Sequence, residues 1–374
     1  MNKIAAPKIF QPPERRFWVC RAQSGQFLEH FFRHEVIAMG HIDPMRSLNF
    51  SETFEASKDK IEKYFKSKSE ILDRTATNHL NQVLHFIADA KAEDLVLTVG
   101  GGSILIGKIL SDAFFEKKNL YIKKGSGKKE KEVEMTQYLR RKVKWVKTIP
   151  RWGMPYSLSK GITGNQTFFN LDGYEDEIYS MISPYVYKKG ELVTNLSILR
   201  EKKISTYHFS KLGLTFLKAE FISKNWESLS QIKTIDELEA RFISFCEEGK
   251  YDSSLVAEFS SPGRTSNALI TTAIGAAIFA LILNISLSGG ELETDWPVKF
   301  KAKTNELIPH ESRVKFFNAL TEFGFDYLRD WLLKDSKNLQ DHLELKQPEG
   351  DFEILESPGQ LIDQPKASLP DNVC

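Results

Sequence analysis

The segment from Ala268 to Gly290 carries no charged residue, and it constrains how this chain of 374 residues can fold more than any other feature. Between Leu269 and Leu287, ten of the nineteen residues are Leu, Ile or Phe. As a helix, this stretch would span about 28 Å, close to the roughly 30 Å thickness of a bilayer core. It must be buried, either in a membrane or inside a folded domain.

Small residues four positions apart, Ala273/Ala277 and Ala276/Ala280, favour the membrane, because this spacing lets membrane helices approach closely. The lack of a flanking aromatic belt favours the alternative, a fully buried helix of a soluble domain or oligomer. We expect a membrane-spanning helix over 268–290 that also mediates homo-oligomer formation.

The chain as a whole has an α+β pattern with five predicted regions. They are a polar arm (1–14), a binding domain (15–183), a small α+β connector (184–258), a C-terminal effector region that contains the apolar helix (259–334), and an acidic disordered tail (335–374).

In the binding domain, hydrophobic periodicity predicts short strands with helices inserted early. We expect strands at 17–21, 36–40, 94–99, 103–110, 141–146 and 166–171, and helices at 27–33, 57–66, 71–90 and 175–183. Strands of this length and spacing favour a small β-barrel.

The C-terminal half is predicted from the same patterns. We expect strand-like runs at 204–209 and 214–219, a helix at 235–247, a β-hairpin at 291–304 and an amphipathic helix at 311–334.

The charge distribution and the cysteines indicate which ligands and which cellular compartment fit the protein. The net charge is +1, but the stretch Lys123–Arg151 is strongly basic, which is an electrostatic footprint for anions such as phosphate, or else a solvated loop. The three cysteines show no CxxC spacing, and the N-terminus has no apolar signal sequence. We expect a cytoplasmic protein, held at the inner membrane if 268–290 spans it, with no metal and no cofactor.

The order of motifs in the binding domain resembles that of PUA-like, EVE-type domains at the N-terminus of Mrr-like restriction proteins and other bacterial defence proteins. The motifs are Trp18-x-x-Arg21, Val36–His41, a helix with Gln82 and Phe86, Asp94–Leu97, Ile106–Ile109, Val143-x-Trp145 and Gln166–Phe168. The resemblance covers about residues 15–175. It implies that a pocket on the small β-barrel binds a base, often a modified one.

The residue types needed for such a site are present. A base needs a flat wall for stacking and polar groups for its edge, and its phosphate needs cations. The candidate walls are Trp18, Trp145 and Trp152; the candidate edge readers are His41, Gln82 and Gln166; the candidate phosphate contacts are Arg21, Arg151, Arg141, Lys142 and Lys144. Trp18, Trp145 and Gln82 also fit a role in the core, whereas Arg151-Trp152 stands in a loop between two prolines.

Gly100-Gly101-Gly102 is not a phosphate loop, because it joins two predicted strands and lacks the GK[ST] motif. Nuclease chemistry would need acidic residues and a lysine to hold Mg²⁺. The nearest set is Glu291, Glu293, Asp295, Lys299 and Lys301, and its spacing contains no (D/E)xK.

Three functions remain open. The favoured one is a sensor–effector protein, which by resemblance suits bacterial anti-phage defence: the binding domain recognises a base, nucleotide or nucleic acid, and the C-terminal region acts at a membrane or in assembly. The alternatives are a modification-dependent restriction nuclease and a soluble, non-enzymatic scaffold that binds nucleic acid. An enzyme is the less favoured class, since no catalytic set stands out.

Overall fold

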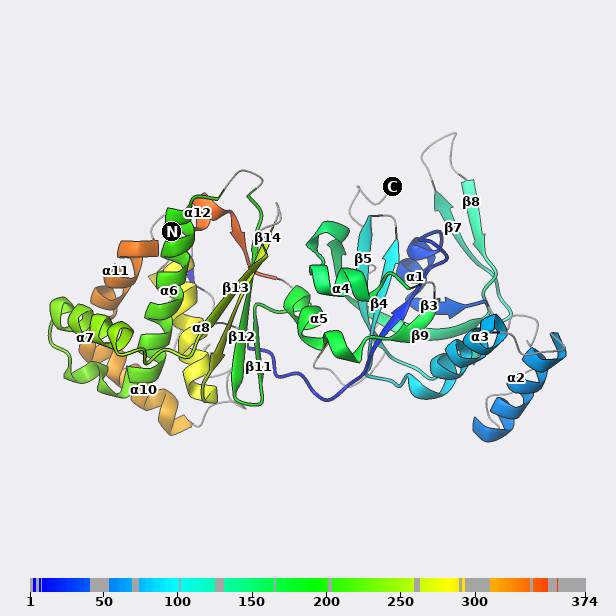
Figure 1. Cartoon of the computed structure of the whole chain (residues 1–374), viewed down its shortest axis with the longest axis horizontal. Helices are drawn as coiled ribbons and strands as arrows, with labels where there is room; N and C mark the ends of the chain where they lie inside the picture. The colour runs from blue at the N-terminus through cyan, green and yellow to red at the C-terminus, as the bar shows by residue number, and fades with distance from the viewer. Residues whose placement is uncertain are drawn as a thin grey trace. The chain divides into compact units, whose positions relative to one another are not determined.

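The computed structural model of the chain divides into two compact units (Figure 1). Unit 1 comprises Met1–Pro13 and Tyr179–Glu349, and unit 2 comprises Glu14–Ile178 and Gly350–Cys374. The structure describes residues 3–4, 7, 9–40, 54–68, 74–100, 102–124, 131–164, 166–200, 204–258, 263–288, 291–292, 310–336, 339–348 and 355. The predicted connector and effector region therefore lie in one unit.

Unit 2 is built from short strands and five helices among its described residues. The strands are β2 (Phe17–Cys20), β3 (Val36–Met39), β4 (Leu95–Gly100), β5 (Ser103–Ile109), β6 (Phe114–Phe115), β7 (Leu120–Lys124), β8 (Lys131–Met135), β9 (Leu139–Pro150) and β10 (Phe168–Asn170). The helices are α1 (Leu28–His34), α2 (Phe54–Lys68), α3 (Arg74–Leu84), α4 (Tyr156–Gly161) and α5 (Glu175–Ile182), which crosses the boundary between the units.

The main sheet of unit 2 is a curled half-barrel with the strand order β10-β2-β4-β5-β9-β3, and β6 pairs with β9. Strands β2 and β4 are parallel, whereas the other pairs are antiparallel. The predicted α+β fold with a small β-barrel is wrong. The fold is mixed α/β, because β2 and β4 are joined by a long crossover through α1, β3, α2 and α3.

Most of the strands predicted in this unit are confirmed to within a few residues. Strand β9 is longer than predicted, since it pairs with β5 over one part and with β3 and β6 over the other. The predicted helix over 71–90 is described from Arg74 on, and after Leu84 it changes into a π-helical turn, His85–Asp89.

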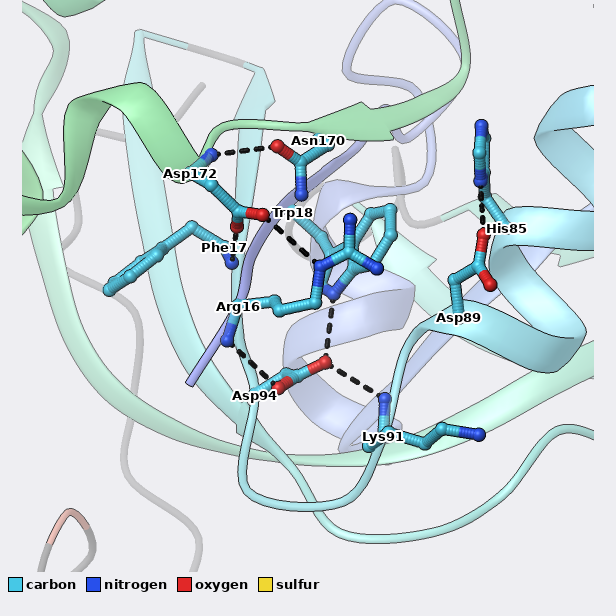
Figure 2. A network of polar contacts seen from close by, with 9 residues as sticks. All are labelled: Arg16, Phe17, Trp18, His85, Asp89, Lys91, Asp94, Asn170 and Asp172. Atoms are coloured by element: carbon cyan, nitrogen blue, oxygen red, sulfur yellow. Dashed lines mark hydrogen bonds and ion pairs between the residues drawn. The ribbon is translucent and has the colours of Figure 1, made fainter. Parts of the chain in front are cut away.

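A network around Asp94 holds the start of β2 against the start of β4 (Figure 2). Its carboxylate accepts hydrogen bonds from the Arg16 backbone N–H (3.0 Å), the Lys91 backbone N–H (2.9 Å) and the Trp18 indole Nε1 (2.9 Å). Asp172 likewise accepts from the Phe17 N–H (2.8 Å). These bonds satisfy a buried carboxylate and fix the register of the parallel pair.

Unit 1 contains an antiparallel sheet covered by helices. Its strands are β11 (Tyr185–Lys188), β12 (Glu191–Ile198), β13 (Ser254–Glu258), β14 (Gly263–Ile270) and β16 (Leu345–Lys346), and a separate parallel pair joins β1 (Lys3–Ile4) to β15 (Glu291–Leu292). Its helices are α6 (Thr206–Asn225), α7 (Ile235–Glu247), α8 (Ala273–Ser288), α10 (His310–Phe323), α11 (Phe325–Ser336) and α12 (Leu339–Leu343), most of which lie on one face of the sheet (Figure 1).

The strands predicted at 204–209 and 214–219 are wrong, because helix α6 contains residues 206–209 of the first run and all of the second. The Ser205 side chain caps this helix by accepting a hydrogen bond from the Tyr207 N–H, and Leu212, Phe216 and Ala219 are buried at helical spacing. The helix predicted at 311–334 is instead two helices, since Gly324 adopts a positive φ of 97° between α10 and α11.

The membrane-spanning helix predicted over 268–290 is also wrong. Its first residues belong to β14, and Thr272 then starts α8 by accepting a hydrogen bond from the Gly275 N–H (3.2 Å). Helix α8 has 16 residues and is about 24 Å long. None of the helices in the described part of the chain combines the length and the apolar character that spanning a bilayer requires.

The apolar side chains of α8 are instead buried within unit 1. The helix contacts α6, α11 and strands β11 and β12, and Ile278, Phe279 and Ile282 are at most 1% exposed. Unit 1 of a single chain therefore buries most of the apolar surface of α8, and the homo-oligomer stays a prediction.

Part of the predicted acidic tail belongs to the fold of unit 1. Leu345 and Lys346 form β16, which pairs with Ser197 and Ile198 of β12. Beyond residue 348, only Leu355 is among the described residues, so most of the tail lies outside them, as does most of the hairpin predicted at 291–304.

Two isoleucines of the apolar segment test its placement. Ile282 is 0% exposed in α8, whereas Ile270 is 67% exposed at the end of β14. We expect Ile282→Ala to lower the free energy of unfolding by about 3 kcal/mol, because it leaves a cavity, and Ile270→Ala to lower it by less than about 1 kcal/mol. Urea denaturation measures both, and equal effects would contradict the buried helix.

A histidine pair in unit 1 predicts a dependence of stability on pH. The rings of His208 and His342 stack at 4.3 Å, and burial, followed by the positive charge of His342, lowers the pKa of His208. As pH falls from about 6.5, the unfolded chain takes up a proton at this residue before the folded chain does, so stability decreases. We expect His208→Gln to weaken the loss of stability between pH 7.5 and about 5, measured by urea denaturation; an unchanged loss would refute this assignment.

Candidate functional site: an arginine and tryptophan cluster at one edge of the sheet

Several predicted site residues meet at one edge of the half-barrel. Because β2 and β4 are parallel, their carboxyl ends lie at the same edge, and β9 ends there too because Pro150 pairs with Ser103. The Arg21 N–H donates to the Thr167 carbonyl (2.8 Å), and the Arg151 N–H donates to the Gly102 carbonyl (2.7 Å). We call Arg21, Arg151, Trp152 and Gln166 the edge cluster.

The glycines at this edge serve close packing. A Cβ on Gly100 would lie 2.4 Å from the Cα of Gly25, a residue with a positive φ of 88°. Glycine therefore lets the loop after β2 lie against the turn between β4 and β5. Gly100 ends β4 and Ser103 begins β5, which confirms that these glycines join strands.

Arg21 is a partly buried cation with unused donors. One Nη2 N–H donates to the Ile162 carbonyl at the end of α4. The Nε atom is buried without a hydrogen-bond partner among the described residues. Burial, followed by the positive charge of Arg151, lowers the pKa of Arg21, and a guanidinium remains charged at neutral pH even so.

Arg151 and Trp152 form a short 3-10 turn that follows β9 directly. Arg151 is exposed, and Trp152 is 57% exposed. Within the described part of the chain, no carboxylate forms an ion pair with Arg21 or Arg151. Two guanidinium groups thus lie within electrostatic range of one another, beside a large exposed aromatic ring.

A second exposed aromatic stands four residues further on, and we did not predict it from the sequence. Tyr156 begins α4, is 67% exposed, and carries the Lys160 ammonium 4.4 Å from its ring centroid. The signal available in the sequence was the Pro155 before it, which starts the helix and leaves Tyr156 on its first turn.

The two predicted glutamines have different environments. Gln82 is buried, and its Oε1 accepts from the backbone N–H groups of Thr167 (2.6 Å) and Phe168 (3.2 Å). It fixes the start of β10 and has no free edge for a base. Gln166 is exposed beside Thr167, within the edge cluster.

Trp18 and Trp145 do not line an open site. Trp18 is 0% exposed, stacks on Phe168 with the ring centroids 4.9 Å apart, and donates to Asp94 (Figure 2). Trp145 is half-buried and donates to the Phe31 carbonyl (3.0 Å). Both stabilise the fold of unit 2, as the alternative reading of the sequence allowed.

The candidate phosphate contacts Arg141, Lys142 and Lys144 do not form one cationic surface. Arg141 is 0% exposed and donates to the carbonyls of Phe86 (2.7 Å), Ile87 (3.0 Å) and Ser111 (2.7 Å). Burial lowers its pKa to about 10. Arg141 therefore braces the π-helical turn and cannot contact phosphate.

Lys144 and Lys142 differ from Arg141 and from one another. The Lys144 ammonium pairs with Glu35 (2.9 Å), so its charge is already matched. Lys142 is exposed, and it alone of the three presents an unmatched charge among the described residues.

The remaining predicted residues lie outside the described part of the chain. They are His41, Glu293, Asp295, Lys299 and Lys301; Glu291 is described and pairs with Lys3 in the β1–β15 strand pair. Among the described residues, no group of three or more His, Cys, Asp or Glu side chains is placed to hold a metal ion.

Comparisons of the chain with protein-family models, with curated proteins and with solved structures find no match. The resemblance to PUA-like domains therefore stays a prediction, and the case for function depends on the geometry of the edge cluster.

The contrast between Arg141 and its neighbour is a test of this geometry. We expect Arg141→Met to lower the free energy of unfolding of unit 2 by about 3 kcal/mol, because three buried carbonyls lose their donor. Lys142→Met, at an exposed position, should change it by less than about 0.5 kcal/mol. Thermal and urea unfolding measure both, and a tolerated Arg141→Met would show that Arg141 is free to act as a surface cation.

Proposed function

We propose that unit 2 binds single-stranded nucleic acid through the edge cluster, with the phosphate held between Arg21 and Arg151 and a base stacked on Trp152. The observation that carries the proposal is the pair of guanidinium groups that repel one another and have no carboxylate partner among the described residues. A phosphate between them would relieve this repulsion and accept hydrogen bonds from both.

The exposed aromatic side chains support a nucleic-acid strand, rather than an isolated phosphate ion, as the ligand. Bases of any sequence stack on aromatic rings, and this contributes about 1–3 kcal/mol for each base. Trp152 and Tyr156 are both more than half exposed and lie on either side of Met154-Pro155. Each exposed ring can stack one base, whereas inorganic phosphate would use neither.

The sensor–effector arrangement predicted from the sequence extends this proposal. Unit 2 is the sensor, and unit 1, with its separate core around α8, is the effector that responds through assembly. The setting that the resemblance implies is bacterial defence against phage, with foreign nucleic acid as the signal.

Binding of a fluorescein-labelled, single-stranded oligonucleotide, followed by anisotropy, tests the proposal. We expect Arg151→Met to weaken binding about tenfold, because a charge-assisted contact to phosphate is lost. In this variant, the slope of the logarithm of the association constant against the logarithm of the salt concentration should fall by about 0.7 in magnitude. Trp152→Ala should weaken binding about tenfold with the salt dependence unchanged.

Lys91→Met is the matched control for charge. Lys91 is exposed in the same unit, before the start of β4 and thus at the opposite end of that strand from the edge cluster. Its loss should leave the affinity within about twofold. If Arg151→Met and Lys91→Met weaken binding equally, the charge of unit 2 acts without a site and the proposal fails.

A further inference from the structure

A hollow in unit 2 lies far from the edge cluster, at the other end of β9. It has a volume of about 490 Å³, which is within the range of small-molecule sites. It lies beside the part of β9 where pairing with β5 ends and pairing with β3 and β6 begins. From Lys142 on its wall to Pro150 next to the edge cluster, β9 extends roughly 26 Å. The two sites therefore do not overlap.

The walls of this hollow combine polar and apolar side chains. Phe114 of β6 is half-buried and pairs with Arg140 of β9, so its ring lies on the face of the sheet that carries Lys142. Leu110, Leu120 and Val36 contribute aliphatic surface. A flat ring buried against this apolar part of the wall removes apolar area from solvent on both partners.

The charges around the hollow leave one cation unmatched. Arg140, Lys142 and Lys144 lie at alternate positions of β9 and so share one face of the strand. Arg140 pairs with Glu116 (2.7 Å) and Lys144 pairs with Glu35 (2.9 Å), and both of these acids line the hollow.

Lys142 lies between the two ion pairs and has no carboxylate partner among the described residues. The remaining titratable group on the wall, His34, has its Nε2 3.2 Å from the Tyr121 carbonyl. The lining thus offers a single ammonium beside an aromatic ring.

We propose that this hollow binds an aromatic monoanion, a ring system that carries one carboxylate or sulfonate. The ring would lie against Phe114, and the anionic group would accept hydrogen bonds from the Lys142 ammonium. A monoanion fits better than a phosphate dianion, because Glu35 and Glu116 would repel a second negative charge and a lysine presents a point charge without a guanidinium fork.

Two fluorescent probes with one ring system separate the roles of ring and charge. Anilinonaphthalene sulfonate is an aromatic monoanion, and phenylnaphthylamine is its neutral analogue. We expect the intact chain to bind both. Lys142→Met should weaken binding of the sulfonate about tenfold and leave binding of the neutral probe within about twofold. Phe114→Ala should weaken binding of both by about threefold or more.

Lys91→Met is again the matched control and should change neither affinity, and circular dichroism checks the fold of each variant. If Phe114→Ala does not fold, Phe114→Leu keeps the apolar volume and removes the ring. The proposal is overturned if the intact chain binds no sulfonate probe, if Lys142→Met binds it as tightly as the intact chain, or if Lys142→Met weakens both probes equally.

Discussion

The Asp94 carboxylate is the interaction on which the arrangement of unit 2 depends. It is 5% exposed and accepts hydrogen bonds from two backbone N–H groups and from the Trp18 indole, which joins the starts of β2 and β4 (Figure 2). An unmatched carboxylate in this position would be costly, so the parallel register is strongly specified. In that register, Arg21 at the end of β2 lies at the same edge of the sheet as Arg151 after β9.

The fold could be predicted from the sequence where a pattern is local. Strands β2 to β5 were predicted closely because their buried residues are continuous and turn residues bound them. The environment that buries the apolar segment could not be predicted in this way. Hydropathy shows that Leu269–Leu287 must be buried, but whether a membrane or a protein core buries it depends on α6, α11 and the sheet, which long-range packing brings together.

At the candidate site, local sequence likewise does not show which charged side chains are buried. Arg141 and Lys142 are adjacent in the sequence and basic, yet one braces a buried turn and the other is exposed, because successive side chains of a strand point to opposite faces. Which face is buried depends on the π-helical turn, whose residues are more than fifty positions away. Arg151-Trp152 could be predicted because its place between prolines identifies a loop.

The central claim, that Arg21 and Arg151 hold a phosphate, is tested most directly by nuclear magnetic resonance of the side-chain Nε–H groups in arginine-labelled protein. A dinucleotide with a phosphodiester linkage should shift the Nε–H signals of Arg21 and Arg151, assigned through Arg21→Met and Arg151→Met. A dinucleotide of the same bases with an uncharged methylphosphonate linkage should leave them nearly in place. If both dinucleotides shift these signals alike, or neither shifts them at saturation, the arginine pair is not a phosphate site.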